Sequence, residues 1–218
     1  MSVENFARDS LKQKINIMNI IRKVNIFLLI IIVAFSTSCK KDNEVLTIDF
    51  GIFLLQDANT VVMNGVIGSN TPQHWDNFIA ANPGVTRMLM KDCPGSEDDT
   101  ANLQAARKIR QQGIAIHLPA AAEIASGAVD LFLAGTIRTR EAGSKIGVHS
   151  WSDGGNKEAT DFPVGHANHQ PYIEYYKEMG FSQDDAAAFY YFTINAAKAA
   201  DIHWMTDAEI EQYKLLTN

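Results

Sequence analysis

The stretch EIASGAVDLFLAGTIR, residues 123–138, sets a single serine, Ser126, between a short apolar segment and a run of small and apolar residues. The segment GIAIHLP before it alternates in the way of a strand with one buried face. Leu131, Phe132 and Leu133 after it indicate a buried helix or strand. Ser126 is therefore predicted to lie where a strand passes into a helix, either as a helix cap or as a nucleophile.

The rest of the chain alternates strands and helices and then becomes helical. Strands are predicted over 61–68, 85–93, 113–119 and 145–151, and helices over 71–81 and 100–112. Thr71 is a candidate cap for the first of these helices, and Thr206 with Glu209 forms a capping box for the last helix of the chain. The C-terminal helices are expected within 171–180, 182–201 and 206–218. This order predicts one α/β domain with a helical appendage.

The N-terminal segment has the pattern of an export signal. Arg22 and Lys23 precede ten uninterrupted apolar residues, 26–35, which are too few to span a bilayer as a helix. Small residues then lead to Cys39, as in a bacterial lipoprotein signal, in which the cysteine is lipidated and becomes the new N-terminus. We expect residues 1–38 to be a signal peptide, 39–50 a polar tether and 51–218 the functional domain. The predicted location is the cell envelope, lipid-anchored on the periplasmic face or the outer surface, with the membrane as a partner through the lipid.

Charge and cysteine content narrow the class of protein. The chain has 19 basic and 25 acidic side chains, of which residues 1–38 hold five and two, so the remainder has a formal charge of −9. An acidic body without a basic stripe argues against nucleic-acid binding. Cys93 has no partner once Cys39 is acylated, and we expect it to be buried. No cofactor and no metal are expected. His166 and His169 are spaced as metal ligands can be, but no cysteine or acidic cluster accompanies them.

Three segments then follow in order: a strand ending in a glycine turn (DCPGS), the serine segment (ASGA) and a strand ending in histidine (GVHSW). This order resembles the ClpP-like serine peptidases of the ClpP/crotonase superfamily. The resemblance extends from about residue 61 to 155, with a further similarity at DIHWMTDAEIEQYKLL near the C-terminus. It implies an α/β spiral of ββα units with C-terminal helices. It also implies a serine hydrolase, a peptidase that can assemble as a homo-oligomer.

The resemblance assigns roles to particular residues. Ser126 would be the nucleophile, His149 the base that takes its proton, and Asp201 the carboxylate that orients the imidazole. Asp207, Asp153 and Asp161 stay open as alternatives for the third role. The backbone N–H groups around Gly95, Ser96 and Gly127 would form the oxyanion hole, because a turn of small residues before a helix offers free donors without blocking the substrate.

Two departures from the family pattern leave other functions open. The family's PGG turn is CPGS in this chain, and the following EDDT segment is acidic for a peptide-binding groove. A catalytically silent, lipid-anchored binding protein of the same fold is therefore the rival hypothesis, and an esterase is a third. The substrate expected of the enzyme is a peptide or an ester.

Overall fold

The computed structural model describes residues 49–217. The predicted signal peptide, the acylated Cys39 and residues 39–48 of the predicted tether lie outside these residues and stay predictions. The elements, in chain order, are β1 (Phe53–Asp57), β2 (Thr60–Met63), α2 (Thr71–Ala81), β3 (Arg87–Met90), β4 (Asp92–Cys93), α3 (Asp99–Gln111), β5 (Ala115–Leu118), β6 (Glu123–Ala125), α4 (Gly127–Leu133), β7 (Arg138–Arg140), β8 (Lys145–Val148), the 3-10 turns η1 (Ala159–Asp161) and η2 (Ala167–His169), α5 (Gln170–Glu178), α6 (Gln183–Ala196), β9 (His203–Trp204) and α7 (Asp207–Gln212).

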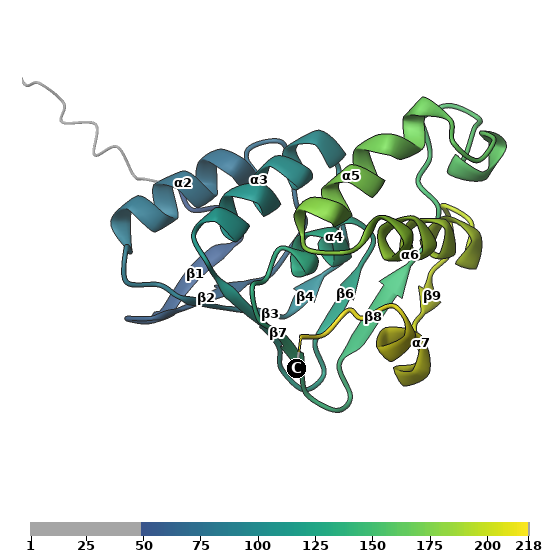
Figure 1. Ribbon diagram of the computed structural model, residues 1–218. Coiled ribbons are helices and arrows are strands. Elements are labelled where there is room, and N and C mark those ends of the chain that lie inside the picture. Colours follow the sequence, from purple (N-terminus) through teal and green to yellow (C-terminus); the bar gives the residue numbers. More distant parts are fainter. Residues whose placement is uncertain (1–48, 218) are drawn as a thin grey trace, which may run out of the picture. The chain divides into compact units, whose positions relative to one another are not determined.

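The strands form two sheets, and the ββα units contribute one strand to each of them (Figure 1). The first has the order β1-β2-β3-β5-β7 and the second the order β4-β6-β8-β9. All pairs are parallel except β1–β2 and β8–β9 at the two edges. In the units β3–β4–α3 and β5–β6–α4 the chain runs through one strand of each sheet and returns by a helix. The predicted α/β spiral of ββα units with C-terminal helices is confirmed.

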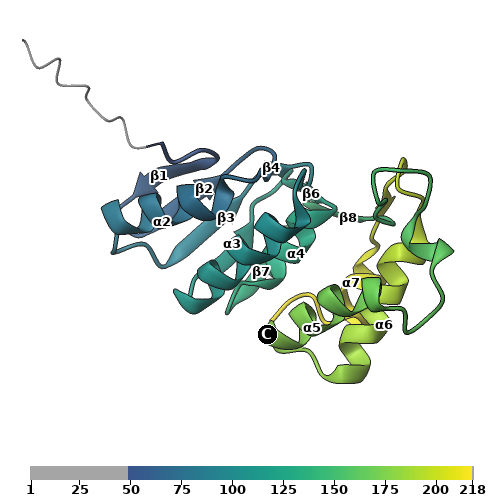
Figure 2. The ribbon, with the colours of Figure 1, turned by 90° about the horizontal axis from the view of Figure 1, so that it is seen from above.

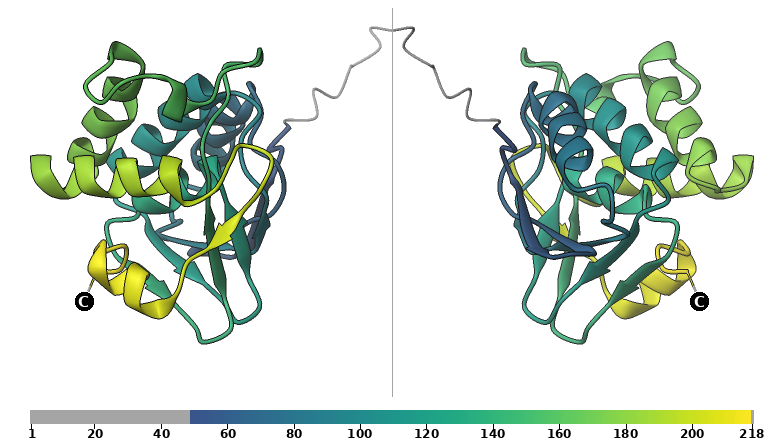
Figure 3. Two further views of the ribbon diagram at one scale, coloured as in Figure 1. Left: turned by 90° about the vertical axis from the view of Figure 1, so that its right-hand side faces the viewer. Right: turned by 90° about the vertical axis from the view of Figure 1, so that its left-hand side faces the viewer.

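Helices α2, α3 and α4 lie in a row against the sheets, and α5 and α6 form a second group beyond β8 (Figure 2). The short helix α7 follows β9 (Figure 3), and Tyr213 at its C-terminal end stacks on Phe192 of α6. The core between helices and sheets is apolar, and Trp75 and Phe78 of α2 are completely buried in it. Cys93 is also completely buried, as expected, and burial raises the pKa of its thiol to about 11.

The structure corrects one predicted strand and the starts of two predicted helices. The strand predicted over 85–93 is two strands, because Lys91 is the point where the chain leaves the first sheet and enters the second. Thr71 does not cap α2: Asn70 holds that position, and the Thr71 hydroxyl accepts a hydrogen bond from the N–H of Gly68. The helix predicted from residue 100 starts at Asp99 and is capped by Asp98, whose carboxylate accepts from the N–H of Ala101.

Other predictions are confirmed. The last helix has its capping box of Thr206 and Glu209, and the apolar residues 131–133 belong to a helix, α4, in which every residue is buried. None of the helices within residues 49–217 is long and apolar enough to cross a bilayer.

Candidate active site

Ser126 lies where a strand passes into a helix, as the sequence predicts, between the end of β6 and the start of α4. The strand is not the predicted segment 113–119, which forms β5 in the other sheet. Its backbone has φ 54° and ψ −134°, a conformation that residues other than glycine rarely adopt and that persists only where the surrounding structure imposes it. Although Ser126 occupies the N-cap position of α4, its hydroxyl makes no capping hydrogen bond. The side chain is half-buried and lines a cavity. The helix-cap interpretation of this serine is therefore wrong in its usual form.

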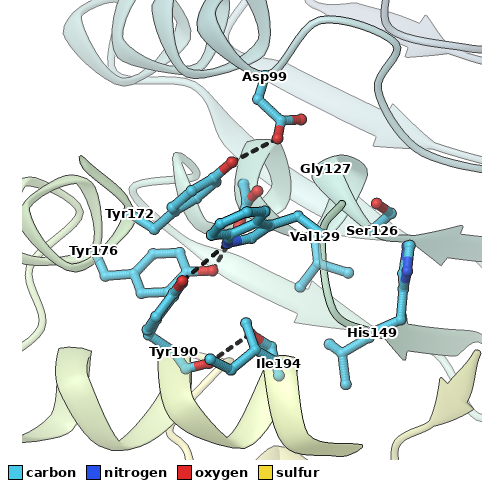
Figure 4. A pocket seen from close by; sticks show the side chains of 13 residues that line it. Asp99, Ser126, Gly127, Val129, His149, Tyr172, Tyr176, Tyr190 and Ile194 are labelled. Atoms are coloured by element: carbon cyan, nitrogen blue, oxygen red, sulfur yellow. Dashed lines mark hydrogen bonds between the residues drawn. The ribbon is translucent and has the colours of Figure 1, made fainter. Parts of the chain in front are cut away.

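His149 follows the neighbouring strand and lines the same cavity (Figure 4). Strands β6 and β8 pair in parallel with Ala125 opposite Gly147, and the N–H of Ser126 donates to the carbonyl of Gly147 at 3.0 Å. Because the carboxyl ends of parallel strands meet at one edge of a sheet, serine and histidine reach the cavity from adjacent strands. Within residues 49–217 no hydrogen bond joins the two side chains, and the buried Nδ1 of His149 has no partner.

The four candidate carboxylates for the third role do not line this cavity. Asp201 is exposed on the segment before β9. The other three are engaged elsewhere: Asp207 with Arg140, Asp153 with the N–H of Gly155, and Asp161 with the N–H of Glu158. The structure thus brings Ser126 and His149 together and adds none of the four carboxylates to them.

The predicted oxyanion residues lie directly beside Ser126. A Cβ added to Gly95 would come within 2.9 Å of the Ser126 Cβ, and one added to Gly127 within 2.2 Å of the Ser96 Oγ. The turn after β4 and the turn after β6 are therefore in direct contact, and this contact is possible because Gly95 and Gly127 have no side chain. Among the described residues, neither the N–H of Ser96 nor that of Gly127 donates to another protein group, so both are available to an oxyanion.

The acidic segment after β4 is part of the site's framework. The Ser96 hydroxyl donates to Asp99 Oδ1 at 2.6 Å, and the Tyr172 hydroxyl donates to Asp99 Oδ2 at 2.6 Å (Figure 4). Burial, together with the nearby Asp99 charge, holds the pKa of Tyr172 well above its usual value, so its hydroxyl keeps the proton that it donates. Two carboxylates of the EDDT segment thus serve to cap α3 and to position the oxyanion turn, which explains its acidity without reference to a ligand.

A second carboxylate, Asp130, was not singled out by the sequence analysis. It lies one helical turn after Ser126 on the buried helix α4, and Tyr176 donates to its Oδ1 at 2.7 Å. Burial raises the pKa of Asp130 to about 7, while the Tyr176 hydrogen bond opposes the shift. The sequence contains a signal that could have identified Asp130. An aspartate in the middle of the apolar segment GAVDLFLAG is expected to be buried, and because burial of a carboxylate costs free energy, such a residue is a candidate for a functional site.

Aromatic side chains form the remaining wall of the cavity, and their polar atoms are used within the wall (Figure 4). Trp151 Nε1 donates to the Tyr190 hydroxyl at 2.9 Å, and that hydroxyl lies 2.7 Å from Nδ1 of His169. Nε2 of His169 lies 3.3 Å from the Phe162 carbonyl, which fixes the ring as an acceptor at Nδ1. His169 is therefore a structural residue. In the described part of the chain no three acidic, histidine or cysteine side chains gather as a metal site would require.

Comparison with known proteins gives structural likeness only. No family model and no curated protein matches the chain. One similar solved structure is that of the 1510-N membrane-bound stomatin-specific protease, in a serine-to-alanine mutant, with a TM-score of 0.48 and 20% identity over 71% of this chain and 75% of that one. Another is a lysine-to-alanine mutant of that protease in complex with a substrate peptide, with a TM-score of 0.44 and 21% identity over 73% and 75%. Likeness of this degree assigns no activity, and the function proposed below rests on the site's own geometry.

Proposed function

We propose that the chain is a serine hydrolase, and specifically a peptidase, with Ser126 as nucleophile and His149 as general base. The observation that carries the proposal is the backbone of Ser126 at φ 54°, at the carboxyl end of β6 and beside the free N–H of Gly127. Strain of this kind at a cavity-facing serine is typical of a nucleophile held for attack. The serine oxygen would attack the substrate carbonyl, His149 would accept the serine proton and return it to the leaving group, and the N–H groups of Ser96 and Gly127 would stabilise the oxyanion.

Asp201 remains the proposed third member. The antiparallel pair β8–β9 sets Val148 opposite His203, so the segment that contains Asp201 passes alongside the strand end that carries His149. The free Nδ1 of His149 needs an acceptor to hold its tautomer. A rotation of the exposed Asp201 side chain toward that atom would supply one when substrate binds.

Labelling by a fluorophosphonate tests the proposal directly, because such a probe forms a covalent bond only with an activated serine. We expect the parent chain to be labelled, and Ser126→Ala and His149→Ala each to abolish labelling. Ser150→Ala is the matched control: Ser150 is completely buried next to His149, does not line the cavity, and donates to the carbonyl of Trp151. A folded parent that takes no label would refute the enzyme.

The rival function, a catalytically silent binding protein, is favoured by one observation: Ser126 and His149 are not hydrogen-bonded, and Nδ1 of the histidine is unpartnered within residues 49–217. Hydrolysis of peptides and of esters would separate the two enzymatic alternatives. An unlabelled chain that nevertheless binds peptides would support the silent form.

We also propose that the chain is exported and lipidated at Cys39, as the pattern of residues 22–39 indicates. Metabolic labelling with an alkyne-tagged fatty acid should mark the parent chain and not Cys39→Ala. Cys93→Ala is the control, since Cys93 is buried and out of reach of a lipid transferase.

A further inference from the structure

The cavity beside Ser126 has an acidic and aromatic composition that the hydrolytic mechanism does not require. Apart from Ser126 and His149, its ionisable members are Asp99, Asp130 and three tyrosines, and no lysine or arginine is among its lining residues. Its volume is about 50 Å³, which is room for a few water-sized groups. The cavity therefore suits a compact chemical group rather than a bulky one.

Hydrogen bonding leaves this cavity with an unused acceptor and few unused donors. The hydroxyls of Tyr172, Tyr176 and Tyr190 and the indole N–H of Trp151 all have partners inside the wall. The Thr193 hydroxyl donates to a carbonyl of its own helix. Beside Asp130 and the aromatic residues, away from Ser126 and Gly127, a bound group thus meets aromatic faces and no free side-chain donor among the described residues.

Asp130 supplies the free acceptor. Its Oδ1 receives the Tyr176 hydroxyl, but its Oδ2 has no hydrogen-bond partner within residues 49–217. That oxygen is also not among the fully enclosed unpartnered atoms of the structure, although the residue is only 9% exposed. Asp130 is among the residues that line the cavity. A buried carboxylate oxygen of this kind is costly unless a donor, best a charged one, comes to it.

We propose that this cavity is a specificity subsite for a primary ammonium group, such as the end of a lysine side chain, which binds Asp130 between the rings of Trp151, Tyr172 and Tyr176. Aromatic faces attract a cation through the negative charge of the ring face, and the carboxylate provides the opposite charge and the acceptor. The inference rests on the proposed function for its biological meaning, since a lysine held there would bring its own carbonyl to Ser126. The binding event itself needs no catalysis.

Binding should therefore be measured in the full chain carrying Ser126→Ala, with n-butylammonium as the probe and n-butanol as its uncharged counterpart. The indole N–H signal of Trp151 in an NMR titration, assigned with Trp151→Phe, reports occupancy. We expect n-butylammonium to shift this signal and n-butanol to require at least tenfold higher concentration. Equal affinity for the two probes, or binding that Trp151 does not sense, would overturn the proposal.

Two further arms keep the test decisive. Asp130→Asn, which keeps the shape of the side chain and an acceptor for Tyr176, should weaken the binding of n-butylammonium at least tenfold, whereas Asp76→Asn, at a surface ion pair with Lys108, should not.

If Asp130→Asn does not fold, the pH dependence of n-butylammonium binding to the chain without that substitution is measured instead. Affinity must then rise with pH through about 7 as Asp130 ionises, and an affinity independent of pH overturns the proposal. The titratable groups around this carboxylate are Asp99 on α3, Tyr172, Tyr175 and Tyr176 on α5, Tyr190 on α6 and, across the cavity, His149.

The outcome separates this inference from the hydrolase proposal. Butylammonium binding without fluorophosphonate labelling would leave a cation-binding cavity and refute the enzyme. Labelling without butylammonium binding would leave the enzyme and refute the subsite. Where both succeed, a diphenyl phosphonate with a lysine side chain should inactivate the parent chain at least ten times faster than one with norleucine.

Discussion

The side-chain amide of Asn102 donates a 2.8 Å hydrogen bond to the carbonyl oxygen of Gly127. Asn102 is completely buried in α3, the helix that follows the Gly95–Ser96 turn, and Gly127 begins α4, the helix that follows Ser126. One hydrogen bond thus ties together the two turns whose N–H groups would form the oxyanion hole. The Oδ1 atom of Asn102 is buried without a partner among the described residues, which costs free energy of folding. The role of this side chain is therefore the hydrogen bond that its N–H donates.

Asn102→Ala should therefore weaken the site more than its distance from Ser126 suggests. We expect fluorophosphonate labelling to slow by about tenfold or more and the free energy of unfolding to fall by about 1–3 kcal/mol, the range for a lost buried partner. Asn77→Ala, at a helix surface, is the control and should change stability by less than about 0.5 kcal/mol. Unchanged labelling in folded Asn102→Ala would mean that the two turns hold their positions without this bond.

The close approach of the two turns predicts the effect of a methyl group at Gly127. The added Cβ would lie 2.2 Å from Ser96 Oγ and 2.7 Å from Ser96 Cβ, so the Ser96 turn would have to move. Gly127→Ala is expected to reduce the labelling rate by about 100-fold or more, in line with the loss of an oxyanion donor. Gly68→Ala is the matched control, because a Cβ there meets nothing within 4 Å. Labelling of Gly127→Ala at the parent rate would exclude the Ser96 turn from the oxyanion hole.

Local sequence patterns predict the alternation of strands and helices, whereas the ββα units and the pairing of Ser126 with His149 come from the family resemblance. The structure brings these two residues to one cavity, and their catalytic roles stay a proposal. His149 follows β8, which the sequence predicts as a strand, but the alternating segment before Ser126 forms β5 in the other sheet. Ser126 follows the three-residue strand β6, whose parallel pairing with β8 brings the two residues together. Four strands were not predicted: β1, β6, β7 and β9. β6 and β7 have three residues each and β9 has two, and β1 (FLLQD) buries only its first residue, so none of them shows a clear alternation. Their pairing is decided by neighbours distant in the chain, which no local pattern encodes.

The inner cavity could not be predicted for a different reason. Asp130, Tyr176 and Tyr190 come from three helices that meet only through packing of α4 with the C-terminal group. The aromatic residues of 171–181 and 187–197 lie in segments that the sequence predicts as helices, and several of them are buried by packing of α5 and α6. What the sequence did not reveal is that the hydroxyls of these tyrosines are directed toward one carboxylate and one histidine.

The raised pKa of Asp130 predicts a stability that falls as pH rises. In the folded chain its pKa is about 7, above the ordinary value of 3.8, so between these values the folded state binds more protons than the unfolded state. The contribution is complete below pH 4 and is lost as pH approaches and passes 7. Roughly 1.4 kcal/mol per pKa unit makes this a loss of a few kcal/mol.

Urea unfolding at pH 5 and pH 8 measures this loss. Asp130→Asn should remove most of the difference between the two pH values and be the more stable chain at pH 8. Asp76→Asn should keep the difference, because Asp76 lies at the surface beside Lys108. A parent chain whose stability rises from pH 5 to pH 8, with Asp130→Asn showing the same rise, would contradict a buried neutral carboxyl at this position.

The third catalytic role can be assigned by comparing four substitutions. Asp201→Asn should slow labelling and hydrolysis by about 100-fold or more, since a histidine without its carboxylate partner loses the required tautomer. Asp153→Asn, Asp161→Asn and Asp207→Asn should leave activity near the parent level, because their carboxylates serve local turns or an ion pair with Arg140. If Asp201→Asn retains full activity, Ser126 and His149 act as a pair, or another of the four takes the role and shows the loss instead.

Arg138 joins the C-terminal segment to the helix of the nucleophile, and its replacement should loosen both. Its guanidinium is buried and donates to the carbonyls of Leu215 at 2.6 Å and Leu133 at 3.4 Å, with no acidic partner among the described residues. Burial lowers its pKa to about 10, so it stays charged at neutral pH.

Arg138→Lys keeps the charge but cannot satisfy several carbonyls at once, and we expect it to lower the free energy of unfolding by about 2–4 kcal/mol. Arg87→Lys, on an exposed position of β3, should cost less than about 0.5 kcal/mol. Superimposable urea curves for Arg138→Lys and the parent chain would show that the charge alone, and not the set of hydrogen bonds, holds the C-terminal segment in place.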